Sequence, residues 1–593
     1  MAHAHRSVVK DPAKAFISTW RTSTVYTGST ANNQIKLPLE IAGTYKFTVD
    51  WGDTTSSVIT TWNQAETTHT YPAPGDYTVT ITGFIKGWDW GGGGTVAPTT
   101  GDMRKLLTIT QFGCLRFVNK LDNVTPIPVW GAFYGCTNLN LTAVQDMPNF
   151  KGTASTFGFL RGCTAITTIN NVNKWDVSKI QIFRNTFREC VNFDDNVGNW
   201  NTGKGTTMIS MFFGSTGPAI PGKFTNGGSP SIGNWDTSNV TDMNAVFTYQ
   251  PSFNQNIGAW DVSKVTTITN MFYGCTVAPF GTFDNGGSDS INNWDTSSVK
   301  NMSQTFFNQP VFNRNIGNWN TGNVTTMSSM FNCPSSGPAG IFNKDISNWN
   351  TSKVTSMFSI FWNQKEFNQE VGKWNTGLVT SMSGMFGCQG VTSGKFNNAG
   401  SNSIKNWNTG NVTSMQTMFQ LQLDFDQEIG TWDVSKVTNF LTFAYGWLSN
   451  SVVGKFNNGG SPSINNWNLS AALSIDRIFY GQGLFNQPIN GWNTTTITNM
   501  GNAFTFNYAF NQPIGNWNVS NVTNFGSSFM NGKTFNDYSA ANYDALLIGW
   551  ASRPVIASRS INFGTIKYTA AAVAARAILT SAPNNWTIVD GGI

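Results

Sequence analysis

The chain has 593 residues and a formal net charge of +5; only 11% of its residues are charged, whereas 13% are aromatic. This length exceeds one compact core, and the low share of charged residues predicts a polar but largely uncharged surface. Lys and Arg form no runs, which argues against nucleic-acid binding. Seven cysteines without CxxC or Cys/His spacing predict neither a disulfide framework nor a zinc site, and we expect buried small residues instead.

The first 30 residues lack periodicity, and we interpret residues 1–30 as an N-terminal extension that serves as an attachment segment. They contain no apolar core of signal-peptide length, and no membrane-spanning run follows. Either a signal has been removed, or the protein leaves its cell without the general secretion route, as a virion component does.

Residues 31–90 predict short strands bounded by Gly, Pro and Asp turns, which indicates a small antiparallel β-sandwich. The segments YKFTVDWGD (residues 45–53) and HTYPAPGDYTVTI (residues 69–81) resemble motifs of polycystic-kidney-disease-type (PKD) domains. The resemblance implies a spacer or binding module of an extracellular protein. Asp50 and Asp53 are candidate calcium ligands, but we expect them to cap turns.

Residues 91–102 predict a Gly-rich junction, and residues 103–535 a tandem repeat. A tryptophan recurs at intervals of 25 residues that alternate, along most of the array, with intervals of 30–35 residues. A fixed period of this length is typical of stacked repeats that cannot bury their apolar faces alone. The thirteen tryptophans are Trp175, Trp200, Trp235, Trp260, Trp294, Trp319, Trp349, Trp374, Trp407, Trp432, Trp467, Trp492 and Trp517.

Repeats such as FNQNIGAWDVSKVTTITNMF (residues 253–272) and FNQPIGNWNVSNVTNFGSSF (residues 510–529) resemble the repeats of BspA-like bacterial surface proteins. The resemblance implies a leucine-rich-repeat-like solenoid. We therefore expect a mainly β fold, in which the solenoid follows the small antiparallel β-sandwich. Residues 536–593 predict an α/β C-terminal cap of two amphipathic helices and a last strand.

Each repeat position has a predicted structural role. The Trp, Val, Met and Phe positions predict core columns, and the alternative for Trp is an exposed aromatic row that stacks sugars. The residue after each Trp is Asp or Asn, with Ser or Gly two residues later in most repeats. This spacing predicts a side chain that closes a turn rather than a row of metal ligands.

Every second repeat is longer, and the extra residues form inserts such as KFTNGGSPSI (residues 223–232). Binding residues concentrate on loops that a rigid scaffold carries. The inserts therefore predict either a repetitive contact surface or loops that only stiffen the array. The candidate binding residues are Phe224, Asn226, Gly227, Phe283, Asn285, Phe396, Asn398, Phe456 and Asn458.

The sequence offers little catalytic chemistry. Histidine occurs only at His3, His5 and His69, and no GxSxG, HExxH or P-loop motif is present. Asp424, Asp426 and Glu428 are non-repeating acidic residues, which we expect to lie on a loop rather than to form a hydrolytic pair. We therefore expect no enzyme, no cofactor and no bound metal.

These features favour a non-enzymatic, surface-exposed structural or adhesion protein, and within that class a phage virion or tail-associated component located at the virion surface. We expect residues 1–100 to contact other virion or cell-envelope proteins, and the repeats to meet a host-surface glycan or protein receptor. We expect neither nucleic-acid binding nor membrane insertion. The alternatives are a secreted bacterial cell-surface adhesin and a carbohydrate-binding protein.

Overall fold

The structure is a computed structural model that describes residues 15–90, 100–117, 131–215, 220–390, 393–448, 452–526 and 528–593. Residues 1–14 of the predicted extension and 91–99 of the predicted junction lie outside the described residues. The chain divides into two compact units, Met1–Asp295 and Thr296–Ile593.

Strands and α-helices lie mainly at the two ends of the chain. The strands are β1 (Phe16–Arg21), β2 (Gln34–Lys36), β3 (Leu39–Asp50), β4 (Ser56–Ile59), β5 (Thr68–Thr70), β6 (Asp76–Trp88), β7 (Leu106–Gln111), β8 (Leu115–Arg116), β9 (Trp447–Leu448), β10 (Val452–Val453), β11 (Ser560–Asn562) and β12 (Thr587–Val589). The helices are α1 (Ala540–Ala551) and α2 (Val573–Thr580). The 3₁₀ helices are η2 (Ala65–Thr67), η3 (Met103–Lys105), η4 (Val172–Lys174), η5 (Pro230–Asn234), η6 (Asn285–Gly287), η7 (Asp289–Asn293), η8 (Asn398–Gly400), η9 (Asn402–Asn406), η10 (Asn458–Gly460), η11 (Pro462–Asn466) and η12 (Ala570–Ala572).

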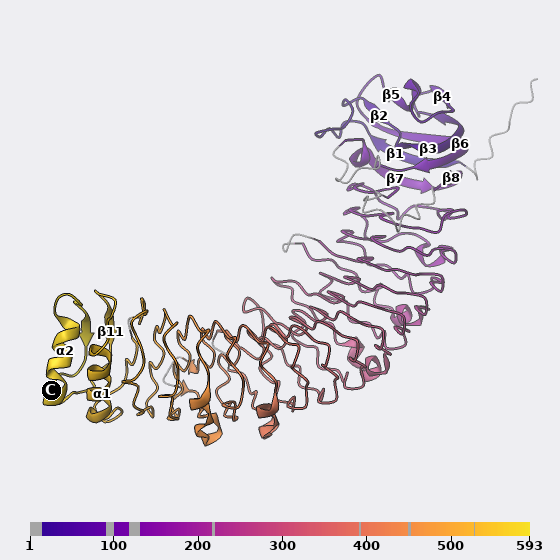
Figure 1. Cartoon of the computed structure of the whole chain (residues 1–593). Coiled ribbons are helices and arrows are strands. Elements are labelled where there is room, and N and C mark those ends of the chain that lie inside the picture. Colours follow the sequence, from indigo (N-terminus) through magenta and orange to yellow (C-terminus); the bar gives the residue numbers. More distant parts are fainter. Residues whose placement is uncertain are drawn as a thin grey trace, which may run out of the picture. The chain divides into compact units, whose positions relative to one another are not determined.

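The N-terminal part of the first unit is one six-stranded sheet with the order β4-β3-β6-β1-β7, in which β8 also pairs with β6 (Figure 1). The pairings are antiparallel except for the parallel pair of β6 and β8. β2 and β5 form a separate two-stranded sheet. Trp20, Trp51 and Trp88 are fully buried and supply much of the apolar volume of this region.

Two segments join this sheet against expectation. β1 lies within the predicted N-terminal extension, yet it pairs with both β6 and β7. Phe16, Ser18 and Trp20 alternate inward along β1, and this period-2 burial is what holds the segment in the sheet. β7 belongs to residues that we assigned to the repeats. The sheet therefore extends beyond both predicted boundaries of 31–90.

Over one segment of each repeat, the backbone N–H groups that bond to the next repeat all act as donors to its carbonyls. In the first unit four backbone N–H groups donate to carbonyls of the next repeat: that of Met243 to Thr267, that of Ala245 to Thr269, that of Phe247 to Met271 and that of Tyr249 to Tyr273. Other N–H groups of this segment bond within their own repeat, as Gln250 N–H does to the carbonyl of Phe247 at 3.2 Å. Ala245 and Tyr249 have φ values of 57° and 58°, in the left-handed region.

This geometry corrects the predicted fold class. Neighbouring strands of a parallel sheet bond to each other in both directions. Here the left-handed residues turn the intervening peptide groups back into their own repeat, so only single bridges remain, such as Thr207 with Asp242 and Ser356 with Ser381. The expected mainly β, leucine-rich-repeat-like solenoid behind an antiparallel β-sandwich is therefore wrong. The described repeats are mainly turns and irregular structure, and the N-terminal region has one six-stranded mixed sheet and one two-stranded sheet.

The tryptophans form buried columns, as predicted. All thirteen are at most 4% exposed, so a sugar-binding row made of these residues is wrong. Seven pairs of neighbouring tryptophans stack with ring centroids 5.8–6.3 Å apart, as Trp235 and Trp260 do in the first unit and Trp349 and Trp374 in the second. Each Nε1 from Trp200 to Trp294 and from Trp349 to Trp517 donates to a Val or Ile carbonyl of the preceding repeat, at 2.7–3.2 Å.

The turn and cysteine predictions are confirmed. Asp176 and Asn350 accept the backbone N–H two residues later, and so do the equivalent residues of most other repeats. All seven cysteines are buried and free. Cys163 and Cys190 donate their thiol protons to carbonyls of the preceding repeat.

Helices α1 and α2 and the parallel pair β11–β12 close the second unit at its C-terminal end (Figure 1). Trp550 of α1 is fully buried, and its Nε1 donates to the carbonyl of Ile514 at 3.4 Å. This helix therefore continues the tryptophan hydrogen-bonding pattern of the repeats and covers the apolar face of the last one.

Candidate functional site

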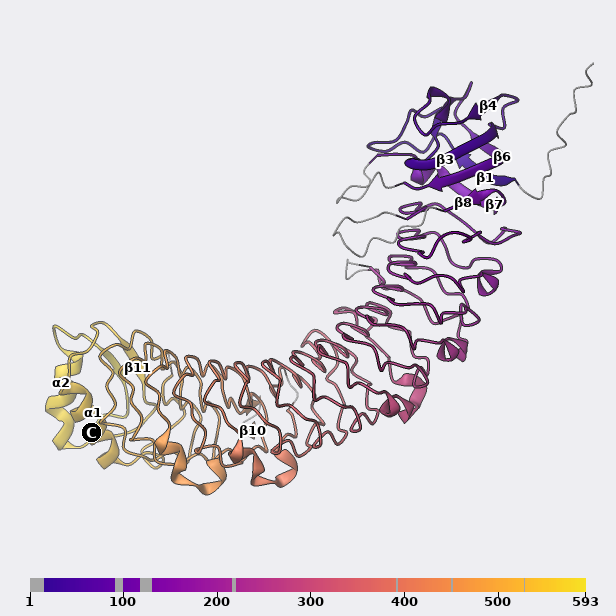
Figure 2. The ribbon, with the colours of Figure 1, turned by 45° about the vertical axis from the view of Figure 1, so that its right-hand side comes forward.

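Four inserts share one backbone design, in which a serine begins a 3₁₀ helix. Ser229 precedes η5, and its Oγ accepts the N–H of Ser231 at 3.3 Å. Ser288, Ser401 and Ser461 cap η7, η9 and η11 in the same way. Serine is a preferred N-cap residue. In the second unit the 3₁₀ helices of the inserts emerge at the same edge of the orange part of the chain (Figures 1 and 2).

The insert asparagines that we proposed as binding residues are fully buried. Asn226 Oδ1 accepts the N–H of Val197 at 2.9 Å, and its Nδ2 donates to the carbonyl of Ser229 at 2.7 Å. Asn285, Asn398 and Asn458 make the equivalent pairs of bonds. These side chains hold each insert to the preceding repeat and present nothing to a partner.

The insert phenylalanines are buried as well. Phe224, Phe283, Phe396 and Phe456 are at most 1% exposed. The ring centroids of Phe224 and Phe212 lie 3.9 Å apart, and those of Phe396 and Phe386 lie 3.6 Å apart. The proposed contact row of these rings is thus corrected, because burying a ring in the core stabilises the protein more than leaving it in water.

The accessible surface of the inserts consists of neighbouring residues. Gly227 is exposed, with a φ of 58°, and it is the one proposed binding residue at the surface. The exposed insert residues of the described chain include Lys223, Gly228, Pro230, Gly286, Gly287, Asp289, Lys395, Ala399, Gly400, Asn402, Lys455, Gly459, Gly460 and Pro462.

The preceding repeat fixes each exposed turn with one acceptor. Asp426 Oδ1 accepts the N–H of Asn457 at 2.7 Å and that of Gly459 at 2.9 Å. Asp194, Asn254 and Asn368 fill the same role for the other three inserts. Because this position holds Asp in two of the repeats and Asn in the other two, the function of the side chain is to accept hydrogen bonds.

The following repeat fixes three of these four inserts with a glutamine that sequence reasoning missed. Gln422 Oε1 accepts the N–H of Phe396 at 2.8 Å, while its Nε2 donates to the carbonyl of Phe386. Gln250 and Gln482 do the same for their inserts, and Gln364 does so for a fifth, shorter insert at residues 338–349. The sequence signal was present, because a Phe-x-x-Gln pattern occurs in the repeat after each insert, as in Phe419–Gln422.

The three non-repeating acidic residues lie on the loops, as expected. Asp424 pairs with Lys455 at 2.7 Å, and both side chains are exposed. Glu428 accepts hydrogen bonds from the hydroxyls of Ser461 and Ser463 at 2.8 and 3.1 Å. These hydroxyls hold the pKa of Glu428 below its ordinary value. Together with Asp426 these residues hold an insert, and such surface pairs contribute little stability.

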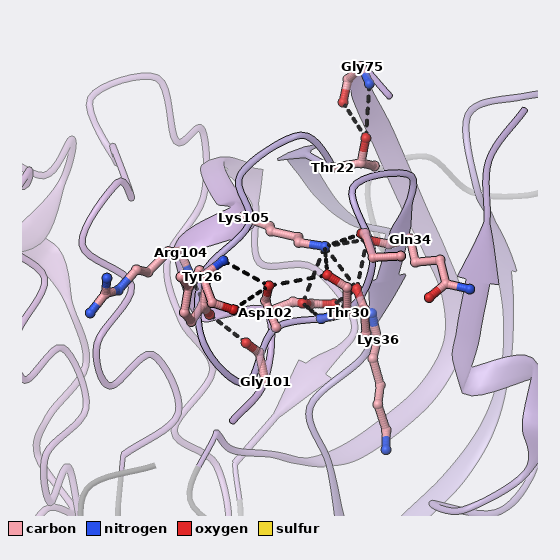
Figure 3. A network of polar contacts seen from close by, with 12 residues as sticks. Thr22, Tyr26, Thr30, Gln34, Lys36, Gly75, Gly101, Asp102, Arg104 and Lys105 are labelled. Atoms are coloured by element: carbon pink, nitrogen blue, oxygen red, sulfur yellow. Dashed lines mark hydrogen bonds and ion pairs between the residues drawn. The ribbon is translucent and has the colours of Figure 1, made fainter. Parts of the chain in front are cut away.

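A second polar cluster, in the first unit, is buried and structural (Figure 3). The Lys105 ammonium donates to the carbonyls of Thr30, Ala31 and Gln34 at 2.8–3.1 Å. Asp102 lies 3.5 Å from this ammonium, and both side chains are 0% exposed. Burial lowers the pKa of Lys105. The cluster joins residues 30–36 of the sheet region to η3.

The described residues contain no group of three or more His, Cys, Asp or Glu that suits a metal ion. Asp50 and Asp53 cap turns, accepting the N–H groups of Gly52 and Thr55 at 3.1 Å. Asp53 Oδ2 also lies 2.8 Å from His69 Nε2. Among the described helices none is long and apolar enough to cross a membrane.

Equivalent tryptophan, asparagine and glutamine bonds in successive repeats define a tandem-repeat protein whose long and short repeats are matched in pairs. A family model described as "Mycoplasma protein of unknown function, DUF285" matches residues 154–225, 219–286, 279–398, 388–457 and 448–546. The chain belongs to this repeat family, which is related to the BspA-like surface repeats. The matches do not reach residues 31–90, so the PKD-like likeness stays a resemblance. No curated protein and no solved structure matches the chain.

Proposed function

We propose that the protein is a non-enzymatic, surface-exposed structural or adhesion protein, in which the repeats are a scaffold and the exposed insert turns contact a partner. One observation carries the proposal. Four exposed turns recur with the same backbone design, each fixed by an acceptor of the preceding repeat and three of them by a bonded glutamine of the following repeat. Turns held in this way need little further ordering when they bind.

The exposed positions vary in chemistry while the buried ones are constant. At the residue after the capping serine, which is the first of η5, η7, η9 and η11, the four inserts carry Pro230, Asp289, Asn402 and Pro462, all of them exposed. The buried Phe and Asn of the same inserts do not change. This division supports a surface that is free to fit a partner on a backbone that is fixed by packing.

The attachment end is proposed to be the N-terminal sheet region, and the carrier to be a virion, with a bacterial cell surface as the alternative. The buried Lys105–Asp102 cluster supports this role for the sheet region, because it ties residues 30–36 firmly to the start of the repeats. Immunogold labelling of intact virions and intact cells of the source organism, with antibodies against residues 452–466, distinguishes the two carriers.

The test of adhesion uses a fourfold variant at the equivalent insert positions, Pro230→Arg, Asp289→Arg, Asn402→Arg and Pro462→Arg. We expect labelled variant protein to bind host or partner cell surfaces at least tenfold more weakly than the native chain. The matched control places four arginines at equivalent exposed threonines outside the inserts, as Thr241→Arg, Thr325→Arg, Thr413→Arg and Thr498→Arg, and retains binding. Equal binding by both variants would contradict the proposal.

A further inference from the structure

One insert carries an aromatic residue, Trp447, that contacts aromatic rings of the two repeats that follow it. Trp447 of β9 stacks on Phe506, with ring centroids 4.0 Å apart and an interplanar angle of 18°. The same indole meets the edge of Tyr480 at 6.4 Å, and Tyr480 stacks on Tyr445 at 4.9 Å. These four rings are half-buried, in contrast to the fully buried tryptophan columns.

The backbone is adapted to this arrangement. Gly481 has a φ of 70°, and a Cβ at this position would lie 2.7 Å from the Cβ of Trp447. The equivalent residues two repeats earlier and one repeat later are Leu421 and Phe506, which are also left-handed but carry side chains. The glycine therefore makes room for Trp447 at a position where other repeats carry bulk.

A pocket of about 340 Å³ opens beside these rings, within the range of small-ligand sites. We call it the aromatic pocket, and its lining residues are Gly390, Gln420, Leu421, Thr442, Tyr445, Trp447 and Arg477. Tyr445 and Trp447 supply aromatic surface. Gln420, Thr442 and Arg477 supply an amide, a hydroxyl and a guanidinium. Sites that bind small molecules combine these two kinds of lining.

The polar groups suit hydroxyl-rich ligands. The Thr442 hydroxyl donates to the carbonyl of Leu441 at 2.8 Å and keeps its lone pairs for a ligand. Among the described contacts the Gln420 side chain has no hydrogen-bond partner, so its amide can both donate and accept. The Arg477 guanidinium lies 3.6 Å from Asp476, which offsets its charge. A site with offset charge does not select a phosphate or another strong anion.

We propose that the aromatic pocket binds one neutral pyranose ring at the end of a glycan. The C–H face of the sugar packs on Tyr445 or Trp447, and its hydroxyls meet Gln420, Thr442 and Arg477. This inference deepens the proposed function and rests on it in one respect, since an adhesion protein reaches surface glycans. The pocket itself can be tested without any cell.

The test is saturation-transfer NMR on the purified full chain. The probes are the methyl glycosides of glucose, galactose and mannose, together with free N-acetylglucosamine, glucuronate and glycerol. Each is used at millimolar concentration. We expect transfer to the ring protons of at least one neutral sugar and none to glycerol. Trp447→Ala and Arg477→Ala reduce this transfer at least tenfold, whereas Tyr273→Ala, at a half-buried ring of the first unit, leaves it unchanged.

Because Trp447→Ala also alters the hairpin of β9 and β10, Gln420→Leu and Thr442→Val provide variants that keep the aromatic packing. We expect both to weaken transfer. The inference is overturned by transfer to glucuronate alone or by no transfer to any neutral sugar. It is also overturned if all four pocket variants give the same transfer as the native chain. If the chain binds a sugar but does not attach to cells, the pocket proposal is supported and the adhesion proposal is rejected. If the native chain binds no sugar and attachment to cells survives Trp447→Ala, only the pocket proposal is rejected.

Discussion

The side chain of Gln422 occupies the space that a β-carbon on Gly394 would need. An ideally placed Cβ would lie 2.2 Å from Gln422 Nε2. Gly222 with Gln250, Gly340 with Gln364 and Gly454 with Gln482 repeat this relationship at 2.2–2.3 Å. A long repeat and the short repeat after it are therefore complementary at one point.

Gly394→Ala tests this complementarity. The added methyl group displaces Gln422 and breaks its bond to the N–H of Phe396, so we expect a loss of about 1–3 kcal/mol in the free energy of unfolding. Urea unfolding followed by circular dichroism measures it. Gly322→Ala is the control, because its Cβ would meet only side-chain ends, at 3.2 and 3.4 Å. An equal loss in both variants would contradict the role of Gln422.

The acceptor role of Asn368 predicts a difference between two substitutions. Asn368 Oδ1 accepts the N–H groups of Asn397 and Ala399 at 2.9 Å. Asn368→Asp keeps the acceptor, as Asp426 does naturally, and we expect a change below about 0.5 kcal/mol. Asn368→Leu leaves both N–H groups without their acceptor, and we expect faster hydrogen exchange at Asn397 and Ala399 and a loss of about 1–3 kcal/mol.

Trp432→Phe isolates the indole hydrogen bond. The ring stays in the column, but the bond from Nε1 to the carbonyl of Ile404 at 3.0 Å is lost. We expect a loss of about 0.5–1.5 kcal/mol in the free energy of unfolding, since the carbonyl of Ile404 loses the indole donor and keeps only the N–H of Trp407 at 3.2 Å. Trp62→Phe, at a tryptophan 40% exposed, is the control and should change it by less than about 0.5 kcal/mol. Thermal unfolding of the two variants gives the comparison.

Lys533 predicts a pH dependence of stability. Its ammonium donates to the carbonyls of Tyr508 and Phe510, and burial lowers its pKa to about 7, against a smaller opposing effect of Asp537. Between pH 7 and about pH 10 the unfolded chain binds more protons at this residue, so the free energy of unfolding rises with pH, by at most about 1.4 kcal/mol per pH unit. Below pH 7 this contribution is constant.

The measurement is urea unfolding at several pH values from 6 to 10. Lys533→Met should abolish the part of the rise that comes from this residue, whereas Lys373→Met, at an exposed lysine, should preserve it. A rise that is identical in the native chain and in Lys533→Met would show that other groups cause it.

The seven thiols should be unreactive in the folded protein. All are buried, and burial raises the pKa of Cys333 and of Cys388 to about 12, so little thiolate forms at neutral pH. We expect Ellman's reagent to detect almost none of them in native protein and all seven in denaturant. Rapid reaction of the native chain would contradict the buried positions.

The sequence alone determined the repeat period, the alternation of long and short repeats, the buried tryptophan columns, the Asx turns and the buried cysteines. Each of these follows from spacing, because equivalent residues in a tandem array must occupy equivalent environments. The Phe-x-x-Gln signal was equally readable, but its meaning depends on a contact with another repeat, as between Gln422 and Phe396.

Only the tertiary structure decided the direction of the backbone hydrogen bonds and the place of the insert side chains. The left-handed conformation of Ala245 and Tyr249 turns intervening peptide groups inward and prevents strands, yet neither residue type requires that conformation. Phe224 and Asn226 looked like the exposed ends of a loop, but packing against two neighbouring repeats buries them. A pattern shows which residues are equivalent, whereas contacts between repeats decide which of them face solvent.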